Sequence, residues 1–316
     1  MKALVTGGGG LCGRFLLRYL DTIGIEAHTL STKSTINHHP HHQISDLLDA
    51  EAIKRILKSI KPDYIFHLAG VMHTGNPSIF YKVNTQFAVT IFYAMEKADI
   101  VNSPILIVGT SAEYGVVSSH QLPISEELSP HPYNHYGISK LAQTLEGLAY
   151  YRKGHPVVIV RPFNIIGPNM NKHLVVQNIV SQIAMIKKGI KEPVIEVGNL
   201  NSKRDFIDVR DVVEIYWKLI NSPSAYGEII NICTGESVSI KQILTTLTSL
   251  TQVEAEIRVK PSLLKPIDIP DHYGNTAKLK RILGYVPSLD IKASLSLILQ
   301  EEIKNELFFN YNLPCI

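Results

Sequence analysis

Short apolar runs alternate with longer amphipathic segments along the first half of the chain. The runs lie at residues 2–6, 25–30, 63–70, 105–109 and 157–160, and they are rich in valine, isoleucine and leucine. Segments between them, such as 49–59 and 77–98, carry apolar residues at helical spacing. Buried strands that alternate with helices are typical of a parallel sheet covered on both faces. We therefore predict an α/β protein with a doubly wound parallel sheet.

The pattern becomes less regular after Gly167. Residues 175–188 and 209–221 have helical periodicity, and 205–208 and 228–232 are strand-like. We expect both strands to return to the main sheet. From about residue 239 to the end, helices and short strands alternate around the proline-rich segment 261–270. This predicts one domain at 1–165, to which 205–235 return, and a smaller discontinuous α/β domain mainly at 166–316.

A glycine-rich stretch joins the first strand to the first helix, with the spacing G-x-x-G-x-x-G. Unpaired N–H groups and the dipole at a helix N-terminus attract phosphate. Glycine also lets the backbone approach a pyrophosphate and lets the helix pack closely on the sheet. A plain structural turn is the alternative, but the flanking strand and helix favour dinucleotide binding by a Rossmann-type sheet. The candidate cofactor residues are Gly7, Gly10, Leu11, Cys12 and Gly13.

The end of the second strand bears on the choice of cofactor. An acid there binds the ribose 2′-hydroxyl of NAD, whereas a basic residue accommodates the 2′-phosphate of NADP. This strand ends in Leu30-Ser31-Thr32-Lys33, which offers hydroxyls and a lysine but no acid. We favour NADP, bound by Ser31 and Lys33, over NAD. A solvated turn with no role in cofactor choice is almost as well supported.

Tyr136 and Lys140 form a candidate proton-transfer pair, because positions i and i+4 share one helix face. A phenol has a pKa near ~10, and a nearby ammonium group stabilises the phenolate and lowers that pKa. Such pairs are common on helices. This one gains weight from the dinucleotide turn and from Thr110 and Ser111, which follow the strand at 105–109.

Together these motifs resemble the extended short-chain dehydrogenases/reductases, the NAD-dependent epimerase/dehydratase family of nucleotide-sugar enzymes, over almost the whole chain. The resemblance implies that Tyr136 is the general acid/base, that Lys140 binds the nicotinamide ribose, and that Thr110 hydrogen-bonds the reacting oxygen. It further implies contacts of Asp46 and Leu47 with adenine. Other residues that it places in the cofactor site are Leu68, Ala69, Gly70 and Asn84.

A narrower resemblance is to the GDP-4-keto-6-deoxy-mannose reductases and the GDP-mannose 4,6-dehydratases, through residues 161–168, 197–213 and 231–235. It implies that Asn164 and Arg204 hold the nucleotide diphosphate of the substrate, for which the planar guanidinium fork is suited. An ion pair of Arg204 with Asp205 or Asp208 is the alternative. The remaining substrate-binding candidates are Ser111 and Lys265, where Lys265 replaces the usual arginine.

Position 112 separates the activities of these relatives. Dehydratases carry a glutamate there that helps to remove the C5 proton, whereas this chain has Ala112, and Glu113 beside it would point differently. We therefore predict an NAD(P)H-dependent reductase of a nucleotide-linked 4-keto-6-deoxyhexose. The resemblance implies that the nucleotide is GDP. Reductases usually have an acid there too, which leaves the sugar open. The alternatives are an epimerase or 4,6-dehydratase, and a non-catalytic regulatory protein that binds dinucleotide or sugar nucleotide.

Composition excludes several other classes. The 316 residues are 45% hydrophobic and 19% charged, which suits a globular protein, and the net charge of +3 indicates neither a nucleic-acid nor a membrane partner. The three cysteines are widely spaced, so we expect no disulfide framework or zinc site. Because a strand begins at once and no apolar run could span a bilayer, we expect a cytoplasmic protein.

Two further segments carry weaker expectations. Histidines at 38, 39, 41 and 42 surround Pro40, and we favour an exposed loop over a metal site because no carboxylate or cysteine stands nearby in the sequence. No metal is therefore predicted. The helix at 77–98 has a broad apolar stripe, and by the resemblance the helices at 77–98 and 133–152 pair across a homodimer.

Overall fold

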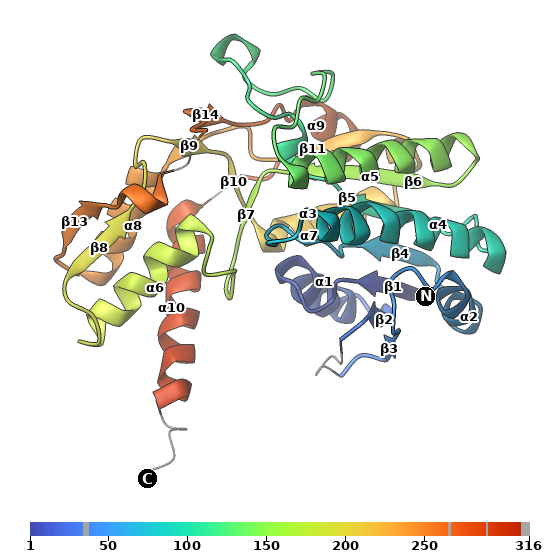
Figure 1. Ribbon diagram of the computed structural model, residues 1–316, viewed down its shortest axis with the longest axis horizontal. Coiled ribbons are helices and arrows are strands. Elements are labelled where there is room, and N and C mark those ends of the chain that lie inside the picture. Colours follow the sequence, from blue (N-terminus) through green and yellow to red (C-terminus); the bar gives the residue numbers. More distant parts are fainter. Residues whose placement is uncertain (34–37, 265–266, 289, 311–316) are drawn as a thin grey trace.

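The computed structural model describes residues 1–33, 38–264, 267–288 and 290–310, with side chains described as far as residue 304. Within these residues, seven parallel strands form the central sheet in the order β11-β6-β5-β4-β1-β2-β3 (Figure 1). This order reverses direction at β1, as in a Rossmann-type sheet, and confirms the predicted fold class. The strands are β1 (Lys2–Thr6), β2 (Glu26–Ser31), β3 (His41–Gln43), β4 (Tyr64–His67), β5 (Ile105–Val108), β6 (Val157–Pro162) and β11 (Ile229–Ile232).

Helices cover both faces of the sheet because its strands are apolar on both sides. One buried cluster joins the sheet to α1 (Leu11–Thr22), α7 (Val209–Ile220) and α9 (Ala277–Leu283). A second joins the opposite face to α2 (Ala50–Ile60), α4 (Phe87–Ala98) and α5 (His135–Arg152). The fold therefore has three layers, and loops at the carboxyl ends of the strands are free to form a site.

The predicted helix at 77–98 is interrupted. It consists of α3 (Pro77–Phe80), a π-helical turn η1 (Tyr81–Gln86) and α4, which follow one another without a break. The wider π-helical turn brings the fully buried Asn84 against the loop after β4, where its side chain bonds to the backbone of Val71. The expectation of one regular helix is therefore wrong at its centre.

A second lobe is built from the later part of the chain, at the left of Figure 1. Its core packs α6 (Val175–Lys187), α8 (Ile240–Thr251) and α10 (Ile291–Asn310) against the parallel pair β8 (Val194–Val197) and β13 (Glu256–Val259). Shorter elements join the lobes: η2 (Ser111–Glu113), η3 (Ser119–Gln121), β7 (Asn164–Ile166), β9 (Lys203–Arg204), β10 (Phe206–Asp208), η4 (Pro223–Ala225), β12 (Val238–Ser239), η5 (Pro261–Leu263) and β14 (Asp271–His272).

One of the two strands expected to return to the main sheet does not join it. β11 pairs with β6 in the central sheet, as predicted, but β10 pairs with β7 in a separate two-stranded sheet. The main sheet is already extended by β11 on that side, so β10 is left to connect the lobes. Helix α7, which follows β10 directly, does return to the central sheet.

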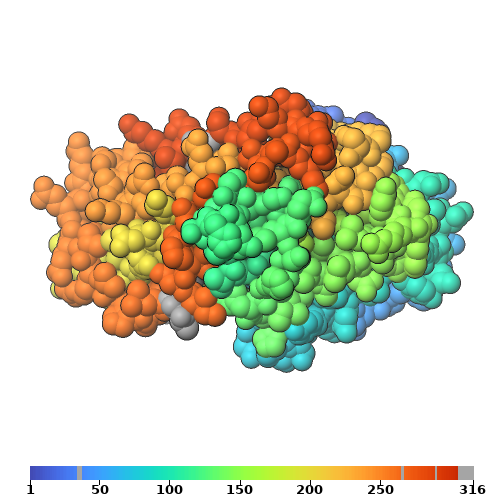
Figure 2. All heavy atoms as spheres, turned by 90° about the horizontal axis from the view of Figure 1, so that it is seen from above, coloured from blue at the N-terminus to red at the C-terminus, as the bar shows by residue number. Residues whose placement is uncertain are grey.

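The view from above shows the two lobes side by side, with the green segment that follows β5 between them (Figure 2). That segment begins with Thr110 and η2, so residues from the carboxyl edge of the sheet face the junction of the lobes. Among the described helices, none is long and apolar enough to cross a membrane.

Candidate active site

The glycine turn after β1 has the shape that the sequence predicts. Gly7 has φ +72°, which L side chains rarely adopt, and a Cβ atom there would lie 2.7 Å from the backbone nitrogen of Ala69. A Cβ atom on Gly13 would meet the Gly7 carbonyl oxygen and would lie 2.7 Å from the Gly8 Cα atom. The turn therefore brings bare backbone to the N-terminus of α1, which fits the pyrophosphate of a dinucleotide.

The other residues of the turn lie at the junction of the lobes. Leu11 packs against the cores of both lobes. The side chain of Arg14 in α1 donates to the carbonyl oxygens of Gly9 and Asn169, each at 3.0 Å. Burial raises the pKa of the Cys12 thiol to about 12, so this cysteine is protonated at neutral pH.

The end of β2 forms a braced turn. The Ser31 hydroxyl donates to the carbonyl oxygen of Lys33 at 2.6 Å, and Gln43 of β3 donates to the carbonyl of Thr32. Farther along the same edge, Asp46 caps its own turn by accepting from the Leu48 amide, and it pairs with Lys82 at 3.1 Å. Leu47 beside it packs against the core.

The loop after β4 lies against α5, the helix that carries Lys140. A Cβ atom on Gly70 would lie 3.1 Å from Lys140 Nζ and 3.3 Å from Asn84 Oδ1, so this glycine permits close packing. The Asn84 amide also donates to Ser139 Oγ of α5 at 2.9 Å. Asn84 thus ties the loop that carries Leu68, Ala69 and Gly70 to the helix that carries Lys140, and its contact with a cofactor stays a prediction.

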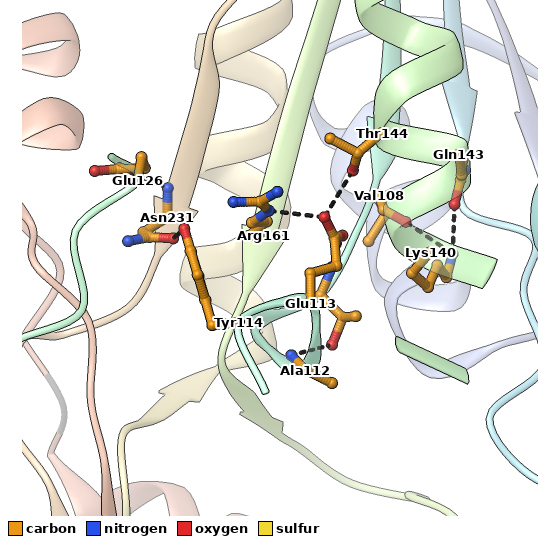
Figure 3. Close-up of polar contacts among 11 residues, drawn as sticks. Val108, Ala112, Glu113, Tyr114, Glu126, Lys140, Gln143, Thr144, Arg161 and Asn231 are labelled. Carbon is orange, nitrogen blue, oxygen red and sulfur yellow. Dashed lines mark hydrogen bonds and ion pairs between the residues drawn. The ribbon is translucent and has the colours of Figure 1, made fainter. Parts of the chain in front are cut away.

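Tyr136 and Lys140 lie in the first two turns of α5, which Asn134 caps by accepting from the Gly137 amide. The phenol of Tyr136 is hydrogen-bonded to Thr110, which precedes η2. Lys140 is buried, and its ammonium group donates to the Val108 carbonyl at 2.8 Å and to Gln143 Oε1 at 2.9 Å (Figure 3). The structure thus brings the three predicted catalytic residues to the carboxyl edge of β5.

Burial dominates the pKa values of this group. Desolvation raises the pKa of Tyr136 to about 12, and the hydrogen bond with Thr110 opposes this only in part. Desolvation also lowers the pKa of Lys140 to about 8, while the nearby Glu113 carboxylate raises it. The lowering of the Tyr136 pKa expected from Lys140 is not seen in this structure: the loss of hydration dominates that pKa, and the Lys140 charge is not among the effects that shift it.

Glu113 has a role that the sequence does not reveal. It is fully buried. Its carboxylate accepts from the Thr110 amide at 2.9 Å. It also accepts from the Thr144 hydroxyl at 3.0 Å and from Arg161 Nε at 2.8 Å (Figure 3). The sequence shows Glu113 only as the residue next to Ala112. The fold shows that its partner is Arg161 of β6.

Two predicted substrate residues lie where the lobes meet. Asn164 begins β7, and its side chain donates to the Asp205 carbonyl at 3.1 Å. Arg204 donates to the carbonyl oxygens of Lys203 and Ile269, both at 2.7 Å. Ser111 is buried within η2. Lys265 lies outside the described residues.

Arg204 does not form the ion pair with Asp205 or Asp208 that was the alternative to binding the nucleotide diphosphate. Asp208 instead binds Arg210 through two hydrogen bonds. Asp205 is fully buried and accepts from Thr234 and from the amide of Gly235. Arg204 therefore keeps donor groups at the lobe junction without pairing with these two carboxylates.

The histidine segment differs from the expected loop. His41 and His42 lie in β3 at the edge of the sheet, which is a strand and not a loop. Asp21 of α1, far away in the sequence, places its Oδ2 atom 3.1 Å from His38 Nε2 and 3.5 Å from His39 Nε2. The assumption that no carboxylate stands nearby is thus wrong: Asp21 is hydrogen-bonded to His38, and one ligand atom from each of Asp21, His38 and His39 lies within 4.8 Å of the others.

The fold and this site identify the class of protein. The sequence profile described as "NAD dependent epimerase/dehydratase family" matches residues 3–233. The chain belongs to this family and is an NAD(P)-dependent oxidoreductase of it, which confirms the resemblance indicated by the sequence motifs.

Individual relatives narrow the comparison. The chain is 32% identical over 305 residues to the GDP-6-deoxy-D-mannose reductase of Pseudomonas aeruginosa, covering 95% of this chain and 96% of that protein. It is 34% identical over 312 residues to the GDP-6-deoxy-D-talose 4-dehydrogenase of Aggregatibacter actinomycetemcomitans, covering 97% and 98%. The solved structure of RMD from Pseudomonas aeruginosa complexed with NADPH has a TM-score of 0.85 at 29% identity, covering 96% and 99%. A Thermotoga maritima UDP-glucose 4-epimerase shares the fold, with a TM-score of 0.87 at 24% identity, covering 97% and 100%.

Proposed function

We propose that this protein is an NADPH-dependent reductase of a GDP-linked 4-keto-6-deoxyhexose. The observation that carries the proposal is the grouping of Thr110, Tyr136 and Lys140 at the sheet edge, with a methyl group at Ala112 in place of a second carboxylate. Such a site can protonate a carbonyl oxygen but has no base at that position for removing a C5 proton. The two relatives above support the GDP-sugar, because mannose and talose differ only at C4 and share one 4-keto precursor.

The residues of the chain have separate tasks in this reaction. A bound NADPH supplies the hydride that reduces the sugar carbonyl at C4. Tyr136 donates the proton to the oxygen as negative charge develops there, and Thr110 holds that oxygen by a hydrogen bond. Lys140 would bind the nicotinamide ribose, and its positive charge supports the negative charge that develops during the transfer. Asn164 and Arg204 orient the nucleotide diphosphate from the other lobe.

The proposed preference for NADPH rests on the end of β2. Ser31 and Lys33 offer a hydroxyl and a positive charge that suit a 2′-phosphate, and the turn 31–33 contains no acid. A structural relative in complex with NADPH supports this choice. The glycine turn fits the pyrophosphate of either cofactor, so the turn at 31–33 is the part of the site that would discriminate between NADP and NAD.

A panel of 4-keto sugar nucleotides tests the proposal. With GDP-4-keto-6-deoxymannose we expect stoichiometric consumption of NADPH at 340 nm, the absorbance of reduced nicotinamide, and a 6-deoxy sugar whose C4 configuration NMR then determines. Turnover with UDP- or dTDP-linked sugars alone would overturn the GDP assignment. A purified protein that recycles tightly bound NAD(H) without net consumption would instead be an epimerase or dehydratase.

We also propose that the protein acts in the cytoplasm as a homodimer. The two cysteines that the structure describes, Cys12 and Cys233, are both free, which suits a reducing compartment. Apolar side chains on α4 and α5 remain exposed, among them Leu145 at 56% and Tyr93 at 44%. A second copy that packs against these helices would cover them.

A further inference from the structure

Glu113 occupies a place in the site that the proposed chemistry does not use. It is fully buried, as is Arg161, and the two form an ion pair with Nε and Oε2 2.8 Å apart (Figure 3). Oε1 of the same carboxylate accepts from the Thr110 amide at 2.9 Å, and Oε2 accepts from the Thr144 hydroxyl at 3.0 Å. One carboxylate therefore contacts η2, α5 and β6 together.

Each of these contacts lies next to a residue of the reaction. Thr110 is the hydrogen-bond partner of the Tyr136 phenol. Thr144 lies one helical turn after Lys140 on α5. The hydrogen bond from Thr144 to Glu113 therefore fixes the position of the helix close to Lys140. Arg161 lies in β6, which leads directly into the strand that begins with Asn164.

The surrounding network makes the pair rigid. The Arg161 guanidinium group lies 4.6 Å from the ring centroid of Tyr114. The Tyr114 hydroxyl donates to Asn231 Oδ1 at 2.7 Å (Figure 3), and the backbone N–H of Asn231 donates to Glu126 Oε1 at 2.9 Å. Arg161 and Glu113 therefore have little freedom to exchange partners or to admit water.

A buried ion pair is a poor way to gain stability alone, because the loss of hydration offsets much of the attraction. Its well-attested use is to fix one arrangement of the elements that it joins. Small displacements matter in an active site, where about 1 Å can change the rate by about 10²-fold. The placement of Glu113 between the catalytic elements is therefore more informative than its contribution to folding.

We propose that Glu113, clamped by Arg161, is a positioning residue that sets the Thr110 loop and the Tyr136–Lys140 helix at their working separation. The role of Glu113 rests on the proposed function, since it is defined by the residues of that reaction. Glu113 touches neither substrate nor cofactor in this arrangement; it acts through the Thr110 amide and Thr144.

Two single variants measure the effect. Glu113→Gln removes the charge, and Thr144→Val removes the tether to α5 while keeping the charge. We expect kcat to fall about 100-fold and about 10-fold, with the Kd for NADPH unchanged within about twofold. Glu302→Gln is the matched control: this buried carboxylate accepts from Gln177 and Ser181 in the other lobe, and we expect its kcat to stay at the wild-type value.

A paired variant separates positioning from stability. Replacing both partners, Glu113→Leu with Arg161→Met, exchanges the ion pair for apolar groups, which is often neutral for folding. We expect the melting temperature to recover toward that of the wild type while kcat stays low. Recovery of both would show a purely structural role and would overturn the proposal, as would a kcat within twofold of wild type in both single variants.

A further readout needs no substrate. The Glu113 carboxylate raises the pKa of Lys140, and a further titratable group near this lysine is the buried His67, whose pKa is lowered to about 3 by burial and by the Lys140 charge. Glu113→Gln should therefore lower the Lys140 pKa below about 8, whereas Thr144→Val should not. NMR of ¹³C-labelled lysine, assigned with Lys140→Met, measures this.

These measurements keep the two proposals distinguishable. An unchanged Lys140 pKa in Glu113→Gln would show that the Glu113 carboxylate does not lie close to the Lys140 ammonium group, and would overturn its placement between the Thr110 loop and α5. Absence of NADPH consumption by the wild-type protein on the sugar panel would overturn the proposed function alone, because the lysine titration is read without substrate.

Discussion

Single residues show how burial changes chemistry that spacing suggests. The i, i+4 spacing of Tyr136 and Lys140 predicts a shared face, and the structure confirms that both reach the same site. Spacing contains no information about hydration, however, and hydration controls both pKa values here. The sequence could therefore predict that these two residues lie together but not their charge states. Glu113 was likewise visible as a residue beside Thr110, but its partner Arg161 is 48 positions away.

The first residue-scale prediction concerns the proton donor. Tyr136→Phe removes the hydroxyl and leaves the ring, so the packing of α5 should persist. We expect kcat to fall by about 10²- to 10⁴-fold, the usual contribution of general acid–base catalysis, with NADPH binding retained. Stopped-flow absorbance of NADPH oxidation measures the rate, and fluorescence titration measures binding. Full retention of turnover would remove Tyr136 from this role.

The second residue-scale prediction concerns pH. The pKa of Lys140 is lowered to about 8, so the free enzyme loses this positive charge as the pH rises through that value. Since the charge supports proton donation by Tyr136, kcat/KM should fall above about pH 8. His67, with a pKa lowered to about 3, stays neutral and adds no further inflection to the pH profile of kcat/KM near neutral pH. In Lys140→Met the residual kcat/KM should not fall above about pH 8. A fall that persists in this variant would be assigned to another titrating group.

Secondary-structure elements were predictable where the spacing of apolar residues along the sequence differs between a strand and a helix. The strands β1, β4, β5 and β6 and the glycine turn follow from short apolar runs and glycine spacing. The π-helical turn η1 does not, because a local change in hydrogen bonding around Asn84 leaves the apolar pattern of 77–98 almost unaltered. The placement of β10 also escapes prediction, since its apolar residues would suit either sheet.

The element-scale prediction concerns the glycine turn. A methyl group in Gly13→Ala would lie 2.7 Å from the Gly8 Cα atom, a contact that backbone cannot relieve without opening the turn. We expect the Kd for NADPH to rise by roughly tenfold or more and the melting temperature to fall, since overpacking costs about 1–3 kcal/mol.

Gly9→Ala is the control for this prediction. It adds the same methyl group where no atom lies within 4 Å, and its φ is not positive. Equal loss of NADPH binding in both variants would show that the turn is sensitive to any side chain, and not to the packing of α1 on β1.

At the scale of the whole molecule, the site forms where two lobes meet. Arg14 links the glycine turn of one lobe to Asn169 at the edge of the other through carbonyl oxygens. The sequence indicated a second, discontinuous domain from the loss of regular alternation after Gly167. It could not show how that lobe places Arg204, because this depends on contacts such as that with Ile269, 65 residues away.

The last prediction concerns assembly. Leu145 and Tyr151 of α5 and Tyr93 of α4 leave 42–56% of their surface exposed on helices whose other faces are buried in the core. Exposed apolar groups on adjacent helices favour association, and a charge placed among them must lose its hydration on association. Leu145→Glu should therefore convert a dimer of twice 35.2 kDa into a monomer, as measured by size-exclusion chromatography with light scattering.

Val259→Glu provides the matched change in the other lobe, where Val259 of β13 is 55% exposed. It should leave the dimer intact, because β13 lies away from α4 and α5 (Figure 1). A wild-type mass of one chain at micromolar concentration would contradict the proposed dimer directly. A dimer that survives Leu145→Glu but is lost in Val259→Glu would place the interface on the second lobe instead.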